Sequence, residues 1–369
     1  MVAHLADRPY SGEVEPTRVY ILGAGCSAGH YPLAKDFLPA LRDYEARLKQ
    51  RPNCPRLHAA VGTTTALLHK YQTPTIDRLA LRLDDELAEQ KKQVHWSEGL
   101  RSAQLEKEAD EKILAAKVAT VALFLEREEA AKRTGLAAYQ DFLTLMFENN
   151  RSPDALNSSQ VRVLTFNYDR LFELAFMAYF RLDSTADHYG PHWLNSGLDF
   201  LTRRAAATVP DRFAFLKLHG TAATWVDQRH GELRYGHTGL HGSTPTIDDK
   251  FLWPQGPPAS PAAIRGPEPL IVFPHEKQRA RQKATTFPFD KYIQATWDQA
   301  LQAVKKAQEV WIIGYSFDPV DRTSMMELLN SSPAERIIIQ NPSADAICKD
   351  LRLHHPNLAQ RITAHAKPF

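Results

Sequence analysis

A turn with two glycines and a serine follows an apolar run near the start of the chain, in the order Gly23-Ala24-Gly25-Cys26-Ser27. The preceding run, Val19 to Leu22, is typical of a buried strand. Glycines at such a turn let backbone N–H groups approach a phosphate, and the start of the next helix adds partial positive charge. The segment indicates nucleotide binding, although many strand–turn–helix junctions carry two glycines by chance.

Polar or glycine residues also follow four later strands of the predicted fold. These residues are Asn167 and Asp169 after 161–166, His219 after 213–218, Gly314 and Ser316 after 310–313, and Asn341 after 336–340. Helical patterns separate the strands, which predicts a doubly wound, mostly parallel α/β sheet. Ligands bind such a sheet at the carboxyl ends of its strands. We therefore expect these residues to converge on one crevice.

Each of these residues also has a structural interpretation. Asp169 is a plausible N-cap for a helix after a plain turn, and His219 and Asn341 are both followed by residues typical of turns. Cys26 suits a small buried position, because no base near it in sequence would activate its thiol. Trp297 falls on the apolar face of a predicted helix, 289–307, and is expected in the core.

Composition narrows the class of protein. The chain has 369 residues, 43% of them hydrophobic, and a net charge of +2, so no electrostatic argument favours binding to nucleic acid or to a membrane. No apolar run approaches the ~20 residues of a membrane span, and residues 1–16 lack a signal-peptide core. Three scattered cysteines suggest a reduced, cytoplasmic protein.

Metal binding is not expected. The histidines that lie close together are His188 and His192, and His230, His237 and His241. Neither group has the spacing of a known ligand set, so surface loops are the preferred interpretation.

The chain divides by pattern into three parts. Residues 17–53 begin the sheet domain, 54–150 read as an inserted helical block broken near Gly135, and 151–369 complete the sheet domain with a Pro/Gly-rich loop region at 227–269. Thr75 and Asp321 are predicted N-caps of the helices that follow them.

Five blocks, in this order, resemble the SIR2-like (sirtuin-type) NAD-binding domains, which have a Rossmann-like fold. They are Gly23-Ala24-Gly25-Cys26-Ser27, Thr165-Phe166-Asn167-Tyr168-Asp169, Lys217-Leu218-His219-Gly220, Gly314-Tyr315-Ser316-Phe317 and Gln340-Asn341. The resemblance covers about residues 17–345 and is loose in the helical and Pro-rich parts.

The departures from the family pattern are specific. No cysteine lies between Cys54 and Cys348, so the four-cysteine zinc ribbon of the family's protein deacylases is absent. The segment after the glycine turn lacks the deacylase Pro-x-Phe-Arg. Tyr168 stands where isoleucine is usual, and Tyr315 where threonine is usual. In these respects the chain looks like the bacterial SIR2-like branch of antiphage defence, whose members hydrolyse NAD.

The resemblance implies a role for each block. Asn167 would orient a water and a ribose hydroxyl, and His219 would be the general base. The remaining residues would bind NAD: Ser27 and the N–H groups of Gly23, Ala24, Gly25 and Cys26 at the pyrophosphate, Asp169 at the carboxamide, Gly314 and Ser316 at the phosphates or proximal ribose, and Asn341 at the adenosine ribose.

The sequence leaves two other functions open. One is an NAD-dependent protein deacylase, against which the missing zinc ribbon counts. The other is a sensor that binds NAD or ADP-ribose without turnover, for which Asn167 and His219 would not be needed. By resemblance, a hydrolase of this type forms oligomers or acts with a gating partner of the ATPase or Argonaute type. Block 54–150 is the candidate surface for such contacts.

Overall fold

A computed structural model of the chain describes residues 17–51, 53–73, 75–94, 99–152, 155, 159–180, 213–227, 232–235, 248, 268–273 and 288–369. Most of the Pro/Gly-rich region 227–269 lies outside these residues, as do the five clustered histidines. The predictions for those segments stay predictions.

A six-stranded parallel sheet forms the centre of the fold. Its strands are β1 (Arg18–Leu22), β2 (Val161–Thr165), β3 (Ala214–Lys217), β7 (Glu309–Ile313), β8 (Arg336–Gln340) and β9 (Ile362–His365), in the order β3-β2-β1-β7-β8-β9. Every pairing is parallel, and the order reverses at β1, between β2 and β7. The prediction of a doubly wound parallel sheet is confirmed, with its switch point at β1.

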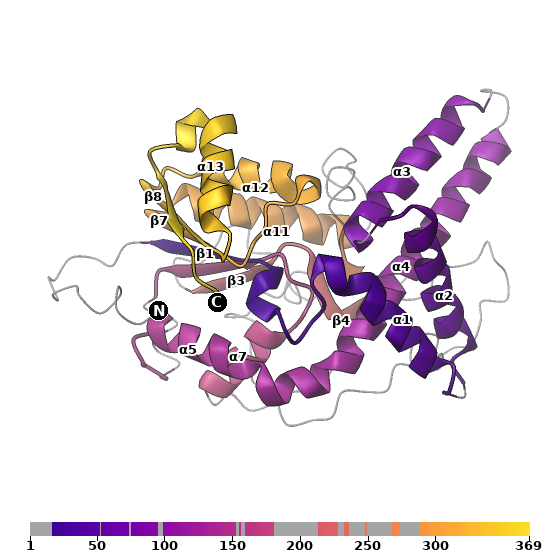
Figure 1. The fold of residues 1–369 in the computed structure, drawn as a ribbon, viewed down its shortest axis with the longest axis horizontal. Coiled ribbons are helices and arrows are strands. Elements are labelled where there is room, and N and C mark those ends of the chain that lie inside the picture. The colour runs from indigo at the N-terminus through magenta and orange to yellow at the C-terminus, as the bar shows by residue number, and fades with distance from the viewer. Residues whose placement is uncertain are drawn as a thin grey trace, which may run out of the picture.

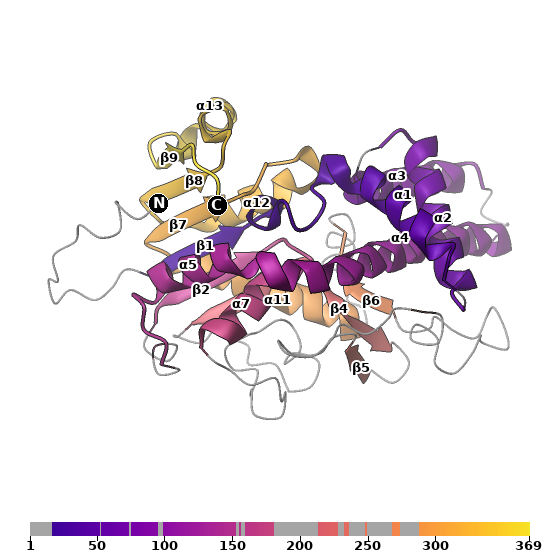
Figure 2. The ribbon, with the colours of Figure 1, turned by 60° about the horizontal axis from the view of Figure 1, so that its bottom comes forward.

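Helices cover both faces of this sheet (Figures 1 and 2). Tyr20 and Leu22 of β1 belong to the core shared with α5 (Leu136–Met146) and α7 (Leu171–Tyr179). Val19 and Ile21 belong to the opposite core, built with α11 (Pro288–Lys305), α12 (Pro319–Ser331) and α13 (Ala344–His354). Strands buried on both faces explain why their sequences are nearly continuous apolar runs.

Four helices between β1 and β2 gather beyond one end of the sheet (Figure 1). They are α1 (Phe37–Leu48), α2 (Pro55–Lys70), α3 (Ile76–Lys92) and α4 (Gly99–Thr134). Helix α4 packs against α2 and α3 and then runs back toward α5 (Figure 2). The predicted break at Gly135 separates α4 from α5, where an added Cβ would lie 2.8 Å from the Ala131 carbonyl oxygen. Among the described residues, no helix combines the length and apolar character that a membrane span requires.

A second sheet of three strands, β4 (Gly220–Asp227), β5 (Glu232–Tyr235) and β6 (Glu268–Ile271), is antiparallel in the order β5-β4-β6. The apolar run Leu270 to Phe273 is typical of a strand. In the structure it overlaps β6, which starts two residues earlier and pairs with β4 rather than joining the main sheet. The Val272 N–H donates to the His219 carbonyl at 2.9 Å, which ties this small sheet to the end of β3.

One of the two predicted helix caps is wrong. Thr75 does cap α3, since its side chain accepts from the Arg78 N–H at 3.1 Å. Helix α12, however, starts at Pro319, and its cap is Asp318, which accepts from the Val320 N–H at 3.0 Å. Proline is favoured at the first helical position, and it moves the start ahead of Asp321. Asp321 is thus left in the first turn with a different partner.

A buried ion pair connects α4 to the segment after β2. The Arg170 guanidinium donates to both carboxylate oxygens of Glu128, at 2.9 and 2.5 Å. Their side chains are only 6% and 2% exposed. Breaking a pair of this kind leaves a charge buried without compensation.

We expect Glu128→Ala to lower the free energy of unfolding by about 3–5 kcal/mol, because the Arg170 charge would stay buried. Chemical denaturation measures this. Glu89→Ala is the matched control: Glu89 pairs with Lys92 on α3, and both side chains are about two-thirds exposed. That loss should be under ~1 kcal/mol. Equal losses in the two variants would contradict the assigned importance of the buried pair.

Candidate functional site

A cavity of about 680 Å³ opens at the carboxyl ends of the parallel strands. All five strand-end blocks reach it, and the sequence-predicted residues in its lining are Ala24, Gly25, Ser27, Asn167, Asp169, His219, Gly314, Ser316 and Asn341. Gly23 is not among the lining residues. A volume of this size is typical of small-molecule sites, and the position next to the switch point is the one expected for a doubly wound sheet.

The turns after β1 and β7 interlock beneath the cavity. The N–H of Gly23 donates to the Ile313 carbonyl at 2.9 Å, and that of Gly25 to the Gly314 carbonyl at 2.8 Å. A Cβ on Gly23 would lie 2.6 Å from the Tyr315 Cα, and one on Gly25 2.7 Å from the Gly314 oxygen. Gly314 itself has φ +65°, the left-handed region that favours glycine. The glycines are therefore required for the close approach of two backbones.

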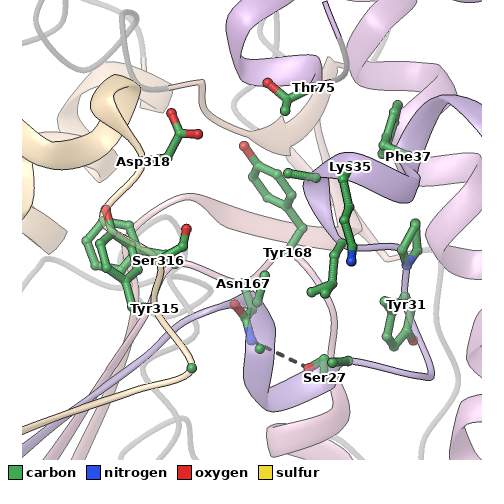
Figure 3. Close-up of a pocket in the computed structure, with 18 of the residues that line it drawn as sticks. Ser27, Tyr31, Lys35, Phe37, Thr75, Asn167, Tyr168, Tyr315, Ser316 and Asp318 are labelled. Carbon is green, nitrogen blue, oxygen red and sulfur yellow. Dashed lines mark hydrogen bonds between the residues drawn. The ribbon is translucent and has the colours of Figure 1, made fainter. Parts of the chain in front are cut away.

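This interlock limits what the glycine turn can offer an anion. The N–H groups of Gly23 and Gly25 donate to the last residue of β7 and to the turn after it, and the Cys26 N–H donates to the Gly23 carbonyl at 3.0 Å. Three of the N–H groups that the sequence assigned to a pyrophosphate thus have protein partners. Among lysines and arginines in the described lining, Lys35 is the cation that extends into the cavity (Figure 3).

Asn167 lies at the centre of the cavity floor. Its Nδ2 is 3.5 Å from Ser27 Oγ, which lies 3.0 Å from the Tyr139 hydroxyl. Figure 3 shows the Asn167–Ser27 contact as a dashed line. The residue is 8% exposed, and its Oδ1 has no hydrogen-bond partner in the described part of the chain. An unpartnered buried acceptor costs about 1–3 kcal/mol, so this oxygen is suited to a water or a ligand hydroxyl.

His219 is enclosed by aromatic rings and faces a carboxylate. It is 3% exposed, with Phe166 edge-on at 4.9 Å and Tyr168 at 5.7 Å between ring centroids. Its Nε2 lies 3.3 Å from Asp321 Oδ1. The sequence analysis predicted Asp321 as the cap of a helix and did not predict its contact with His219. The one sequence feature that could have indicated this contact is the position of Asp321, a carboxylate within one helical turn of the strand-end block 314–317.

Asp169 lies just before α7 and also lines the cavity. Its Oδ1 accepts from the Leu171 N–H at 2.9 Å, but the N-cap of α7 is Arg170, so the cap interpretation of Asp169 is wrong by one residue. Its predicted contact with a carboxamide stays a prediction. Burial raises the pKa of its carboxyl, which the Lys217 ammonium partly offsets. Lys217 Nζ lies 2.8 Å from Glu173 Oε1 and also donates to the Asp169 carbonyl.

Asn341 shapes a turn with both ends of its amide. Its Nδ2 donates to the Tyr315 carbonyl at 3.1 Å, and its Oδ1 accepts from the Ser343 N–H at 2.8 Å. The side chain thus connects the turns after β7 and β8. Ser316 is exposed at the rim. Any contact of Asn341 with a ligand would have to compete with these two bonds.

Residues between the glycine turn and α4 complete the cavity, and the sequence patterns assigned none of them to it, although they predicted Thr75 as a helix cap. Figure 3 shows Thr75, Phe37 and Tyr31 across from Tyr315 and Asp318. The residues of this segment that line the cavity include Tyr31, Lys35, Phe37, Thr75, Ile76, Asp77, Thr120 and Phe124. Their positions follow from helix packing, which local patterns do not report.

Carboxylates outnumber cationic side chains in this lining, and aromatic rings recur in it. The Tyr168 hydroxyl donates to Asp77 Oδ1 at 3.1 Å, and Arg78 joins Asp318 at 3.1 Å, linking α3 to α12. Tyr31 stacks on Phe124 at 5.0 Å, and burial raises the pKa of its phenol well above the ordinary value. Aromatic faces beside carboxylates suit a flat, positively charged ring.

The Cys26 thiol is buried and hydrogen-bonded. Burial raises the pKa of the Cys26 thiol, and its Sγ donates to the Ile313 carbonyl at 3.2 Å, in keeping with a filler rather than a nucleophile. Within the described ranges, no three His, Cys, Asp or Glu side chains are grouped so that they could hold a metal ion.

Comparison with known proteins adds no family. No protein-family model matches this chain, and a search of the curated proteins finds no match.

We expect Gly25→Ala to destabilise the protein by about 1–3 kcal/mol, because its Cβ would overlap backbone atoms of Gly314 that cannot move aside. Thermal unfolding measures this. The control is Gly62→Ala within α2, where the nearest atom to an added Cβ is 3.8 Å away. That change should stabilise by about 0.5–1 kcal/mol. A Gly25→Ala protein as stable as the wild type would refute the interlock.

Proposed function

We propose that the protein hydrolyses the nicotinamide–ribose bond of NAD⁺ to nicotinamide and ADP-ribose. The observation that carries the proposal is the unpartnered, buried Asn167 Oδ1 in a cavity that His219 also lines. The five strand-end blocks that resemble SIR2-like domains support it, because they meet around that same cavity. The resemblance further suggests a bacterial antiphage effector that depletes NAD.

The chemistry follows from the side chains. The bond between nicotinamide and the ribose C1′ breaks, nicotinamide leaves with the electron pair, and the ribose passes through an oxocarbenium-like state. Water then adds to C1′ and gives up one proton. Asn167 Oδ1 would accept a hydrogen bond from this water or from a ribose hydroxyl, and His219 would take the proton.

The surroundings favour such a transition state. Carboxylates of Asp169 and Asp321 lie in the lining, where negative charge stabilises a developing oxocarbenium. The pyridinium ring of NAD⁺ is flat and cationic, which matches the aromatic and acidic walls. Lys35 is the side chain best suited to the phosphates, since the glycine-turn N–H groups are largely engaged.

We expect purified wild-type protein to release nicotinamide from NAD⁺, and Asn167→Ala and His219→Ala each to lower the rate roughly 10²-fold or more. Chromatography of nicotinamide measures this. Lys349→Ala, an exposed change on α13, is the control and should keep the wild-type rate. NAD left intact by the wild type in the presence and absence of cell lysate would refute the hydrolase.

Two further measurements separate the alternatives. Removal of the acyl group from an acyl-lysine peptide, dependent on NAD⁺, would indicate a deacylase. Binding of NAD⁺ in calorimetry without any nicotinamide release would indicate a sensor module.

We also propose that the helical block, α2 to α5, carries the surface for self-association or for a gating partner. Helix α4 supports this, because it contributes Thr120 and Phe124 to the cavity and pairs through Glu128 with Arg170, beside Asp169. Contacts made along α3 and α4 would therefore act on the segment that holds the proposed catalytic asparagine. Leu100, at the start of α4, is 90% exposed.

We expect the double charge reversal Arg82→Glu and Asp85→Lys, at exposed positions of α3, to reduce the assembly's mass in light scattering, because like charges would oppose the contact. The matched control reverses Asp345 and Lys349 on α13, which is outside the helical block. An unchanged mass in the α3 variant would count against this surface.

A further inference from the structure

Asp321, which was predicted from the sequence as a helix cap, lies against His219, the proposed base. Asp321 Oδ1 is 3.3 Å from His219 Nε2, with the two side chains 13% and 3% exposed. The cap of α12 is Asp318, so the start of the helix does not depend on the Asp321 carboxylate. Its position in the first turn of α12 is one where the helix stabilises negative charge.

The rest of the surroundings restrict the His219 ring. Phe166 meets it edge-on, with 83° between the ring planes, and Tyr168 lies on it at 33°. The backbone is held on both sides, because Val272 N–H donates to the His219 carbonyl and Trp297 Nε1 donates to the Leu218 carbonyl at 3.2 Å. A ring held in this way presents fixed nitrogens to its neighbours.

We infer that Asp321 is the positioning residue for His219: its carboxylate accepts the Nε2 proton and leaves Nδ1 as the basic nitrogen. A neutral imidazole carries one proton, and an acceptor facing one nitrogen selects the tautomer that donates to it. In the hydrolysis proposed above, on which the catalytic part of this inference rests, the proton released by water moves to Nδ1. The imidazolium formed is then stabilised by Asp321.

Two other carboxylates of the site have partners of their own. Asp77 of α3 accepts from the Tyr168 hydroxyl, and Asp318, at the start of α12, pairs with Arg78. Asp321 Oδ1 faces the ring itself, 3.3 Å from Nε2. Its removal should change the ring's proton distribution more than removal of Asp318.

Asp321→Asn tests the inference by two independent readouts. Long-range ¹⁵N–¹H spectra, with His219 assigned from a His219→Gln variant, report the tautomer without any substrate. We expect the Nε2–H form in the wild type and its loss in Asp321→Asn. Asp318→Asn is the matched control: it removes one charge at the same helix start, keeps a capping side chain, and should retain the Nε2–H form.

Kinetics supply the second readout. We expect Asp321→Asn to lower kcat roughly 10²-fold with KM changed by less than about threefold, because the loss concerns the base and not binding. A carboxylate favours the imidazolium, so without it the ring releases its proton at lower pH, and the acid limb of the pH–rate profile should move to lower pH. A loss of folding alone would not produce that displacement.

The outcomes separate this inference from the proposed function. If Asp321→Asn loses the Nε2–H form but the wild type leaves NAD⁺ intact, the proposed hydrolase activity is wrong, while the inference that Asp321 positions His219 stands. A wild type in the Nδ1–H form, or an Asp321→Asn protein with unchanged tautomer and rate, would overturn the inference while hydrolysis stands. Even if the Asp321→Asn variant fails to fold, the wild-type spectrum alone shows whether His219 carries its proton on Nε2 or on Nδ1.

Discussion

The close approach of two backbone turns, after β1 and β7, is the constraint on which the rest of this structure depends. Gly25 and Gly314 meet with their backbones in contact, where no Cβ would fit. This contact closes the switch point of the sheet and sets the floor of the cavity. Asn341 extends the same arrangement to β8 by donating to the Tyr315 carbonyl.

Buried charge is the second organising feature. Glu128–Arg170 and Lys217–Glu173 are pairs with at most 8% of any side chain exposed, and both adjoin the segment that follows β2. Pairs of this kind add little net stability compared with apolar residues of similar size. Their effect here is to hold Asn167 and Asp169 from both sides, through α4 and through β3. Two buried oxygens in this region have no hydrogen-bond partner in the described part of the chain, Glu173 Oε2 and Asn167 Oδ1, and Asn167 is the one of these two residues that lines the cavity.

Much of the fold followed from local patterns. The strands and helices of the main sheet, the break at Gly135 and the cap at Thr75 were predictable because periodicity and capping are local properties. Convergence of five strand ends on one cavity was predictable from parallel topology alone. The cap at Asp321 was wrong by three residues because Pro319 sets the start of α12. Strand β6 was found, but its membership of an antiparallel sheet was not.

By itself, the sequence determined which residues end the strands and therefore which side chains surround the cavity, because a parallel sheet brings its carboxyl ends to one edge. Only the tertiary structure decided what those residues contact. Three features join positions from 91 to more than 280 residues apart: the pairing of Asp321 with His219, the hydrogen bonds from the glycine N–H groups to the end of β7 and its turn, and the contact of Asp77 with Tyr168 in the cavity wall. Such contacts depend on how elements pack, and neither periodicity nor spacing along the chain carries that information.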